Sequence, residues 1–120
     1  MKPIKVLIAD DKDEVADVLN LVVQLSGVFE TETLNSGRAA FHAIRANHYD
    51  LIIMDNQMDE DQKFWGEKLV AHIRRELPDA KIILCSSEKI PEECEPDLFW
   101  PKPFPSLDEM IAAIKQWFPQ

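Results

Sequence analysis

The chain has 120 residues, of which 46% are hydrophobic, and it carries a formal net charge of −9. This length and apolar content fit one domain spanning residues 1–120. The acidic balance argues against direct binding of nucleic acid, because the phosphate backbone would repel it. No apolar run is long enough to cross a membrane, and the two cysteines have no framework spacing. We therefore expect a soluble, cytoplasmic protein with reduced thiols.

Short apolar runs alternate with amphipathic stretches along the whole chain. Runs bounded by turn residues predict strands, and apolar residues spaced three or four apart predict helices. In chain order we expect strand 6–9, helix 14–26, strand 29–34, a helix capped by Ser36 and running to about residue 47, strand 51–54, helix 62–76, strand 82–85, strand 98–100 and a last helix capped by Ser106.

This alternation predicts an α/β fold, with a parallel sheet covered by helices on both faces. Five strands suggest the flavodoxin-like, doubly wound order 2-1-3-4-5. The fourth helix of such a fold is expected to be shortened or absent, because Pro91 and Pro96 interrupt the short stretch before the last strand. At most about a turn and a half of helix fits there, and we expect residues 87–97 to be mobile.

Polar side chains stand at the carboxyl ends of four predicted strands. Asp10 and Asp11 follow the first strand, Asp55 follows the third, Ser86 follows the fourth, and Lys102 lies just beyond the fifth. Ligands of open α/β sheets bind beyond these ends, near the point where the strand order reverses. We therefore expect the five side chains to meet at one edge of the sheet.

These residue types together indicate phosphoryl transfer. Three carboxylates at one place repel one another and need a cation, and an all-oxygen set favours a hard ion such as Mg²⁺. The Lys102 ammonium and the Ser86 hydroxyl would stabilise charge on the oxygens of a transferred phosphoryl group. Asp55 is then both a metal ligand and the natural nucleophile, because a carboxylate on that metal can form an aspartyl phosphate. The plainer alternative is that the aspartates are ordinary surface turn residues.

Four segments of the chain carry a family resemblance. They are VLIADD at 6–11, DLIIMDNQM at 50–58, KIILCSS at 81–87 and FWPKPF at 99–104. Together they resemble the receiver domains of two-component response regulators, in the family's order and over almost the whole chain. The resemblance implies a stand-alone phosphoacceptor receiver over residues 1–120. Its implied partners are a sensor histidine kinase or phosphotransfer protein, and a downstream protein that reads the phosphorylated state.

The resemblance also implies a role for each acidic position. Asp55 matches the phosphoacceptor. Asp11 matches the residue that ligates Mg²⁺ directly, and Asp10 matches the one that helps largely through water. Gln57, two residues after the acceptor, would give its backbone carbonyl to the metal.

The remaining matches concern the response to phosphorylation. Ser86 resembles the residue that bonds the phosphoryl group on activation, Lys102 the lysine that contacts it, and Phe99 the aromatic switch residue. The Lys102-Pro103 bond resembles the family's cis peptide. The chain departs from the family pattern in two places: the loop MDEDQKFWGEK at 58–68 is longer than usual, and the stretch before the last strand lacks room for a full helix.

Two other functions remain open. A pseudo-receiver would keep the fold and signal through protein contact without phosphorylation, which the long loop and the missing helix favour. A small phosphatase with an Asp nucleophile would typically carry a second Asp two residues after the first, where this chain has Gln57. We therefore expect no enzyme acting on a separate substrate, since a receiver catalyses only its own phosphotransfer and dephosphorylation.

Overall fold

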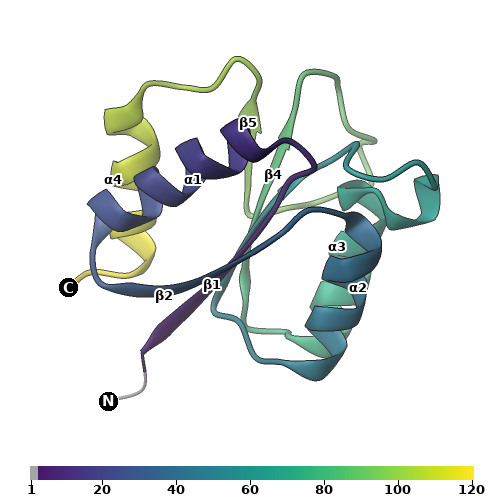
Figure 1. Cartoon of the computed structure of the whole chain (residues 1–120), viewed down its shortest axis with the longest axis horizontal. Helices are drawn as coiled ribbons and strands as arrows, with labels where there is room; N and C mark the ends of the chain where they lie inside the picture. The colour runs from purple at the N-terminus through teal and green to yellow at the C-terminus, as the bar shows by residue number, and fades with distance from the viewer. Residues whose placement is uncertain (1–2) are drawn as a thin grey trace.

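A computed structural model of the chain describes residues 3–120. Its strands are all parallel and follow the predicted order β2-β1-β3-β4-β5. They are β1 (Ile4–Ala9), β2 (Phe29–Leu34), β3 (Leu51–Asp55), β4 (Lys81–Ser86) and β5 (Leu98–Pro101). Figure 1 shows helices on both sides of the sheet: α1 (Asp13–Ser26) and α4 (Leu107–Trp117) on one side, α2 (Gly37–Ala46) and α3 (Gly66–Glu76) on the other. Within the described residues, no helix has the length and apolar character needed to cross a bilayer.

The central strands bury side chains on both of their faces. Val6 and Ile8 of β1 belong to the core under α1 and α4, whereas Leu7 and Ala9 belong to the core under α2 and α3. β3 divides its side chains in the same way, and this explains why it is a continuous apolar run. The two cores hold β1 and β3 side by side, so that their carboxyl ends meet at one edge.

Two helices begin at the serines that the sequence predicts as caps. The Ser36 hydroxyl accepts a hydrogen bond from the Ala39 amide at 3.1 Å, and the Ser106 hydroxyl accepts one from Glu109 at 3.2 Å. Each bond satisfies an amide that the first turn of a helix leaves without a backbone partner. Both predicted caps are confirmed.

The predicted helix over 62–76 is wrong at its start. Gln62–Phe64 (η1) is a single 3-10 turn, and α3 begins only at Gly66. Trp65 between them is extended, with φ −69° and ψ 150°. The turn presses against the start of α2 so closely that a Cβ on Gly37 would lie 1.8 Å from the Phe64 carbonyl oxygen. Packing against α2 therefore overrides the helical periodicity of this stretch.

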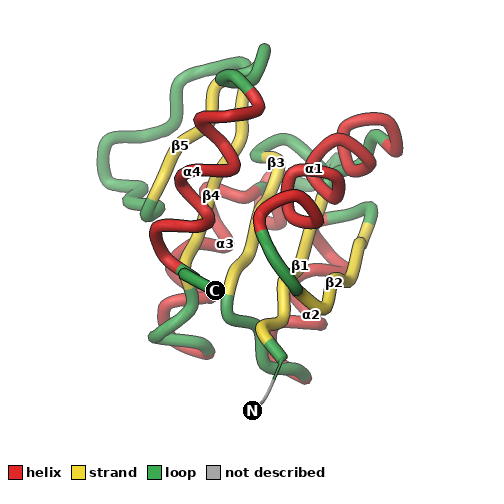
Figure 2. Tube along the Cα trace, turned by 90° about the vertical axis from the view of Figure 1, so that its left-hand side faces the viewer, coloured by secondary structure: helices red, strands yellow, loops and turns green. Residues whose placement is uncertain are grey.

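The absence of a full helix between β4 and β5 is confirmed. Residues 87–97 form turns and irregular backbone, without a helix or strand. Figure 2 shows this connection as an irregular loop at the β5 edge of the sheet. Ile90 and Cys94 are half-buried against the core under α2 and α3, and a groove of about 640 Å³ lies between α3 and this connection.

Candidate functional site

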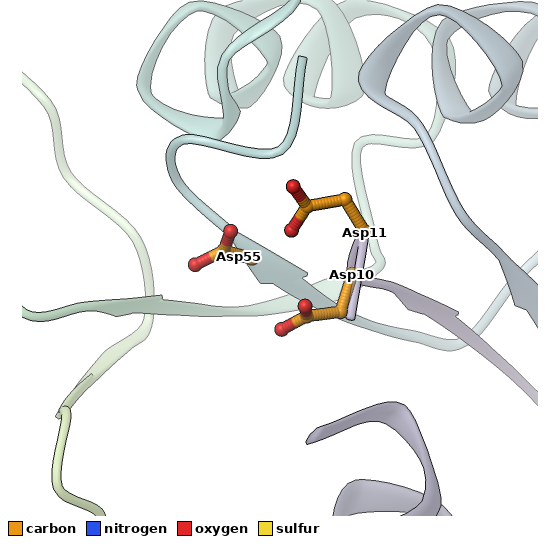
Figure 3. A group of neighbouring side chains, drawn as sticks. All are labelled: Asp10, Asp11 and Asp55. Carbon is orange, nitrogen blue, oxygen red and sulfur yellow. The ribbon is translucent and has the colours of Figure 1, made fainter. Parts of the chain in front are cut away.

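Three carboxylates converge at the carboxyl ends of β1 and β3. Asp10, Asp11 and Asp55 each offer an oxygen within 4.8 Å of the others. Figure 3 shows the three side chains gathered where the two strands end. Asp10 is 1% exposed and Asp55 is 8% exposed, whereas Asp11 faces solvent. Two of the three charges are therefore held out of water, where repulsion between them is strong.

Lys102 binds two of these carboxylates directly. Its Nζ lies 2.8 Å from Asp55 Oδ1 and 3.1 Å from Asp10 Oδ2, and it donates a hydrogen bond to each. Burial alone would lower the pKa of Lys102, but the hydrogen bonds and charges of Asp55 and Asp10 together raise it above its ordinary value. The lysine is therefore firmly cationic at neutral pH.

Ionisation of Asp10 remains unfavourable despite this lysine. Burial raises the pKa of its carboxyl, and the nearby charge of Asp55 raises it further. The Lys12 amide, which donates to Asp10 Oδ1 at 2.9 Å, and the Lys102 ammonium only partly offset these effects. One ammonium does not compensate three carboxylates, and the cluster therefore keeps a net negative charge.

The donor set fits a hard divalent ion. All the candidate side-chain ligands are carboxylate oxygens, which Mg²⁺ prefers over nitrogen or sulfur. Acidic pockets of this kind hold Mg²⁺ in receiver domains generally. Gln57 is exposed, and its side chain donates to Glu88 Oε2 at 3.0 Å.

A small pocket of about 130 Å³ opens beside Asp55, with Ser86 and Lys102 in its walls. Ser86 is 4% exposed, and its hydroxyl accepts a hydrogen bond from the Glu88 amide at 3.0 Å. The pocket therefore brings a carboxylate, an ammonium and a hydroxyl together around a space suited to a small anionic group. The predicted convergence of these side chains at one edge agrees with this geometry.

Two other predicted features lie near this pocket. The Lys102-Pro103 peptide bond is cis, as the resemblance implies. Phe99 on β5 is 37% exposed and does not line the pocket. The position of Phe99 does not test its predicted switch role, which stays a prediction.

Sequence reasoning overlooked Asn56 and Glu67. The Asn56 side chain accepts a hydrogen bond from the Glu67 amide at 2.7 Å and donates one to Glu67 Oε1 at 2.9 Å. A polar residue following an apolar strand was one signal available in the sequence. The other was Trp65, which offers no oxygen at the position where α3 needs a cap.

Comparison with known proteins agrees with this fold. The family model of the response regulator receiver domain matches residues 6–115. The chain is 41% identical over 83 residues to the regulatory protein AtoC of Escherichia coli (strain K12); the match covers 69% of this chain and 17% of AtoC. The chain thus spans less than a fifth of that relative.

Solved structures share the same fold. The chemotaxis response regulator CheY4 of Vibrio cholerae superposes with a TM-score of 0.77 at 23% identity, over 96% of this chain and 98% of that one. A CheY-like response regulator receiver domain protein from Methanospirillum hungatei gives 0.82 at 18% identity, over 97% and 94%. The family match, together with parallel strands in the order 2-1-3-4-5 and an acidic cluster at the switch point, identifies a receiver domain of two-component signalling. This chain belongs to the response regulator receiver domain family.

Proposed function

We propose that this receiver is a phosphorylation switch whose acceptor is Asp55. The observation that carries the proposal is the pairing of Asp55 with Lys102 at 2.8 Å, inside a carboxylate cluster that also includes Asp10 and Asp11. A nucleophilic carboxylate, a cation site and a fixed ammonium are the parts that phosphoryl transfer requires. The receiver fold alone does not support phosphorylation, because a pseudo-receiver would share that fold.

In this proposal an Asp55 carboxylate oxygen forms the new bond to phosphorus. The bond from phosphorus to the donor's leaving atom breaks, and that atom leaves with its electron pair. Asp10, Asp11, Asp55 and the Gln57 backbone carbonyl would hold Mg²⁺, which would supply positive charge next to the phosphoryl oxygens. Lys102, already cationic in the pocket, stabilises the same developing charge and stays paired with the product.

Ser86 is proposed to report the modification. At rest its hydroxyl accepts from the Glu88 amide, which lies at the start of the β4–β5 connection. A phosphoryl group on Asp55 offers a stronger, charged acceptor for that hydroxyl. If the Ser86 hydroxyl turned toward the phosphoryl group, it would release the Glu88 amide and residues 87–97 would reorder. Phe99 on β5 would then change its position as well. The output would be a change in the order of this connection, available to a partner protein.

The proposed donors are a sensor histidine kinase or a phosphotransfer protein, and the proposed reader is another protein. Receivers are not enzymes in the ordinary sense, since the phosphoryl group passes to the receiver's own side chain. The charge of −9 disfavours nucleic acid as the reader.

The test is uptake of phosphate from acetyl phosphate with Mg²⁺, followed by intact mass. We expect the wild type to gain one phosphoryl group and Asp55→Asn to gain none. Asp79→Asn, at an exposed turn away from the site, is the matched control and should behave as the wild type. Equal uptake by Asp55→Asn would refute the assignment. No uptake by the wild type would favour the alternative of a pseudo-receiver that signals by contact alone.

A further inference from the structure

Asn56, the residue after the proposed acceptor Asp55, has hydrogen-bond partners for its backbone amide, its backbone carbonyl and its side chain. Asn56 is 1% exposed. Its amide donates to the Cys85 carbonyl on β4 at 2.8 Å, and its carbonyl accepts from the Gly66 amide at 2.8 Å. Its side chain binds both the backbone and the carboxylate of Glu67. A buried amide with every group paired has one orientation of low energy, because any other leaves a polar atom without a partner.

The start of α3 is seated against the same peptide. A Cβ on Gly66 would lie 3.0 Å from the Asp55 carbonyl oxygen and 2.4 Å from Leu84 Cδ1. The helix begins after Trp65, which supplies no side-chain cap, and the oxygen of Asn56, eleven residues before Glu67, takes that role. The peptide that carries Asp55 is thus fixed between β4 on one side and the first turn of α3 on the other.

We propose that Asn56 is a positioning residue for phosphoryl transfer and that Glu67 orients it. The inference rests on the proposed function of Asp55. By holding the peptide between Asp55 and Gln57, the pair sets the direction of the acceptor carboxylate and of the carbonyl offered to the metal. Nucleophilic displacement depends steeply on such alignment, and a shift of about 1 Å can cost about a hundredfold in rate.

A purely structural reading assigns the pair to capping of α3 and nothing more. Two variants of Glu67 separate the readings. Glu67→Ala keeps the backbone amide that Asn56 caps and removes only the carboxylate that orients the Asn56 side chain. Glu67→Gln keeps an oxygen that can accept from the Asn56 amide group. Ser106→Ala removes a comparable cap from α4, whose start lies outside the phosphoacceptor pocket, and serves as the control for lost stability.

The experiment measures the maximal rate of phosphate uptake from acetyl phosphate at saturating Mg²⁺, per folded molecule, beside the melting temperature. We expect Asn56→Ala to be at least about tenfold slower. Glu67→Ala should also be slower per folded molecule, and its melting temperature should fall by a few degrees because the buried Asn56 amide group loses its acceptor. Glu67→Gln should retain the rate of the wild type, and Ser106→Ala should lose stability without losing rate.

Wild-type rates in folded Glu67→Ala and Asn56→Ala would overturn the proposal and leave only a helix cap. A Glu67→Gln variant as slow as Glu67→Ala would overturn it too, because the hydrogen bond would then be irrelevant. If Asn56→Ala does not fold, Glu67→Ala alone decides. Failure of the proposed function is distinct, since the wild type itself would then take up no phosphate and both proposals would fall.

Discussion

Two connections leave the candidate site, and they are built differently. Residues 56–65, after β3, bury three side chains, Asn56, Met58 and Phe64. Residues 87–97, after β4, bury none, although Ile90 and Cys94 rest against the core. Both connections face the same pocket, one beginning beside Asp55 and the other beside Ser86.

The first connection is held by a contact to α2 and by a contact within itself. The Asp59 carboxylate accepts from the Arg38 amide at the start of α2 at 3.1 Å, and the Asp59 carbonyl accepts from the Trp65 indole at 2.8 Å. The amides of Asp61 and then Arg38 hold the pKa of Asp59 below its usual value. In the second connection the contacts of Gln57 with Glu88 and of Arg74 with the Glu95 carbonyl are exposed, and the part-buried bond from the Ile82 amide to the Asp97 carboxylate lies at its end. The difference indicates a site whose acceptor side is fixed and whose hydroxyl side is free to respond.

Amide hydrogen exchange should show the largest contrast between the two connections. Within residues 3–120, the backbone amides of Lys89, Glu92 and Glu93 donate no hydrogen bond. Those of Asn56 and Gly66 are bonded and buried. We expect the first group to exchange at least about a hundredfold faster, because exposed, unbonded amides need no opening event. Equal protection in both connections would break the comparison.

The next effect concerns the contact between η1 and α2. A Cβ at Gly37 would lie 1.8 Å from the Phe64 carbonyl oxygen, a backbone atom that cannot move without its turn. We expect Gly37→Ala to lower the free energy of unfolding by about 2 kcal/mol, as overpacking usually does. Urea unfolding measures it. Ala39→Gly, two residues along the same helix, is the control for altered helix propensity. A Gly37→Ala variant as stable as the wild type would show that residues 56–65 are not firmly docked.

The smallest expected effect concerns the negative charge of Asp10 in the candidate site. Because burial raises the pKa of Asp10, ionisation of this carboxyl costs stability in the metal-free protein. Asp10→Asn keeps an oxygen for the Lys12 amide and should raise the melting temperature at pH 7 by a few degrees.

The pH dependence of that gain has a definite sign. As the pH falls from neutral toward 3.8, the folded wild type takes up the Asp10 proton before the unfolded chain does. The wild type is then stabilised relative to the variant, and the difference in melting temperature narrows. Mg²⁺ should stabilise the wild type more than Asp10→Asn. If the melting temperature of Asp10→Asn instead rose further above that of the wild type toward low pH, the raised pKa of Asp10 would be contradicted.

Much of the fold follows from local pattern. The β1 and β3 runs are apolar throughout because both of their faces are buried, and Ser36 and Ser106 mark helix starts because each caps an amide. The convergence of Asp10, Asp55 and Lys102 was predictable too, since parallel strands end at one edge.

What the sequence could not predict depends on contacts between distant segments. The helical pattern of 62–76 breaks because Phe64 packs against Gly37, which lies far back in the chain. The cap of α3 by Asn56 is likewise invisible to a rule that looks for a cap immediately before the helix. Neither interaction leaves a periodic signal, because each joins residues that no helical or strand repeat relates.

The central claim is that the phosphoryl group resides on Asp55. Treat the wild type with acetyl phosphate and Mg²⁺, reduce the acyl phosphate with borohydride, and map the altered residue in proteolytic peptides by mass spectrometry. The account predicts conversion of Asp55 alone, within the segment 50–58. Conversion at Asp10, at Asp11 or at a carboxylate outside the pocket would contradict it.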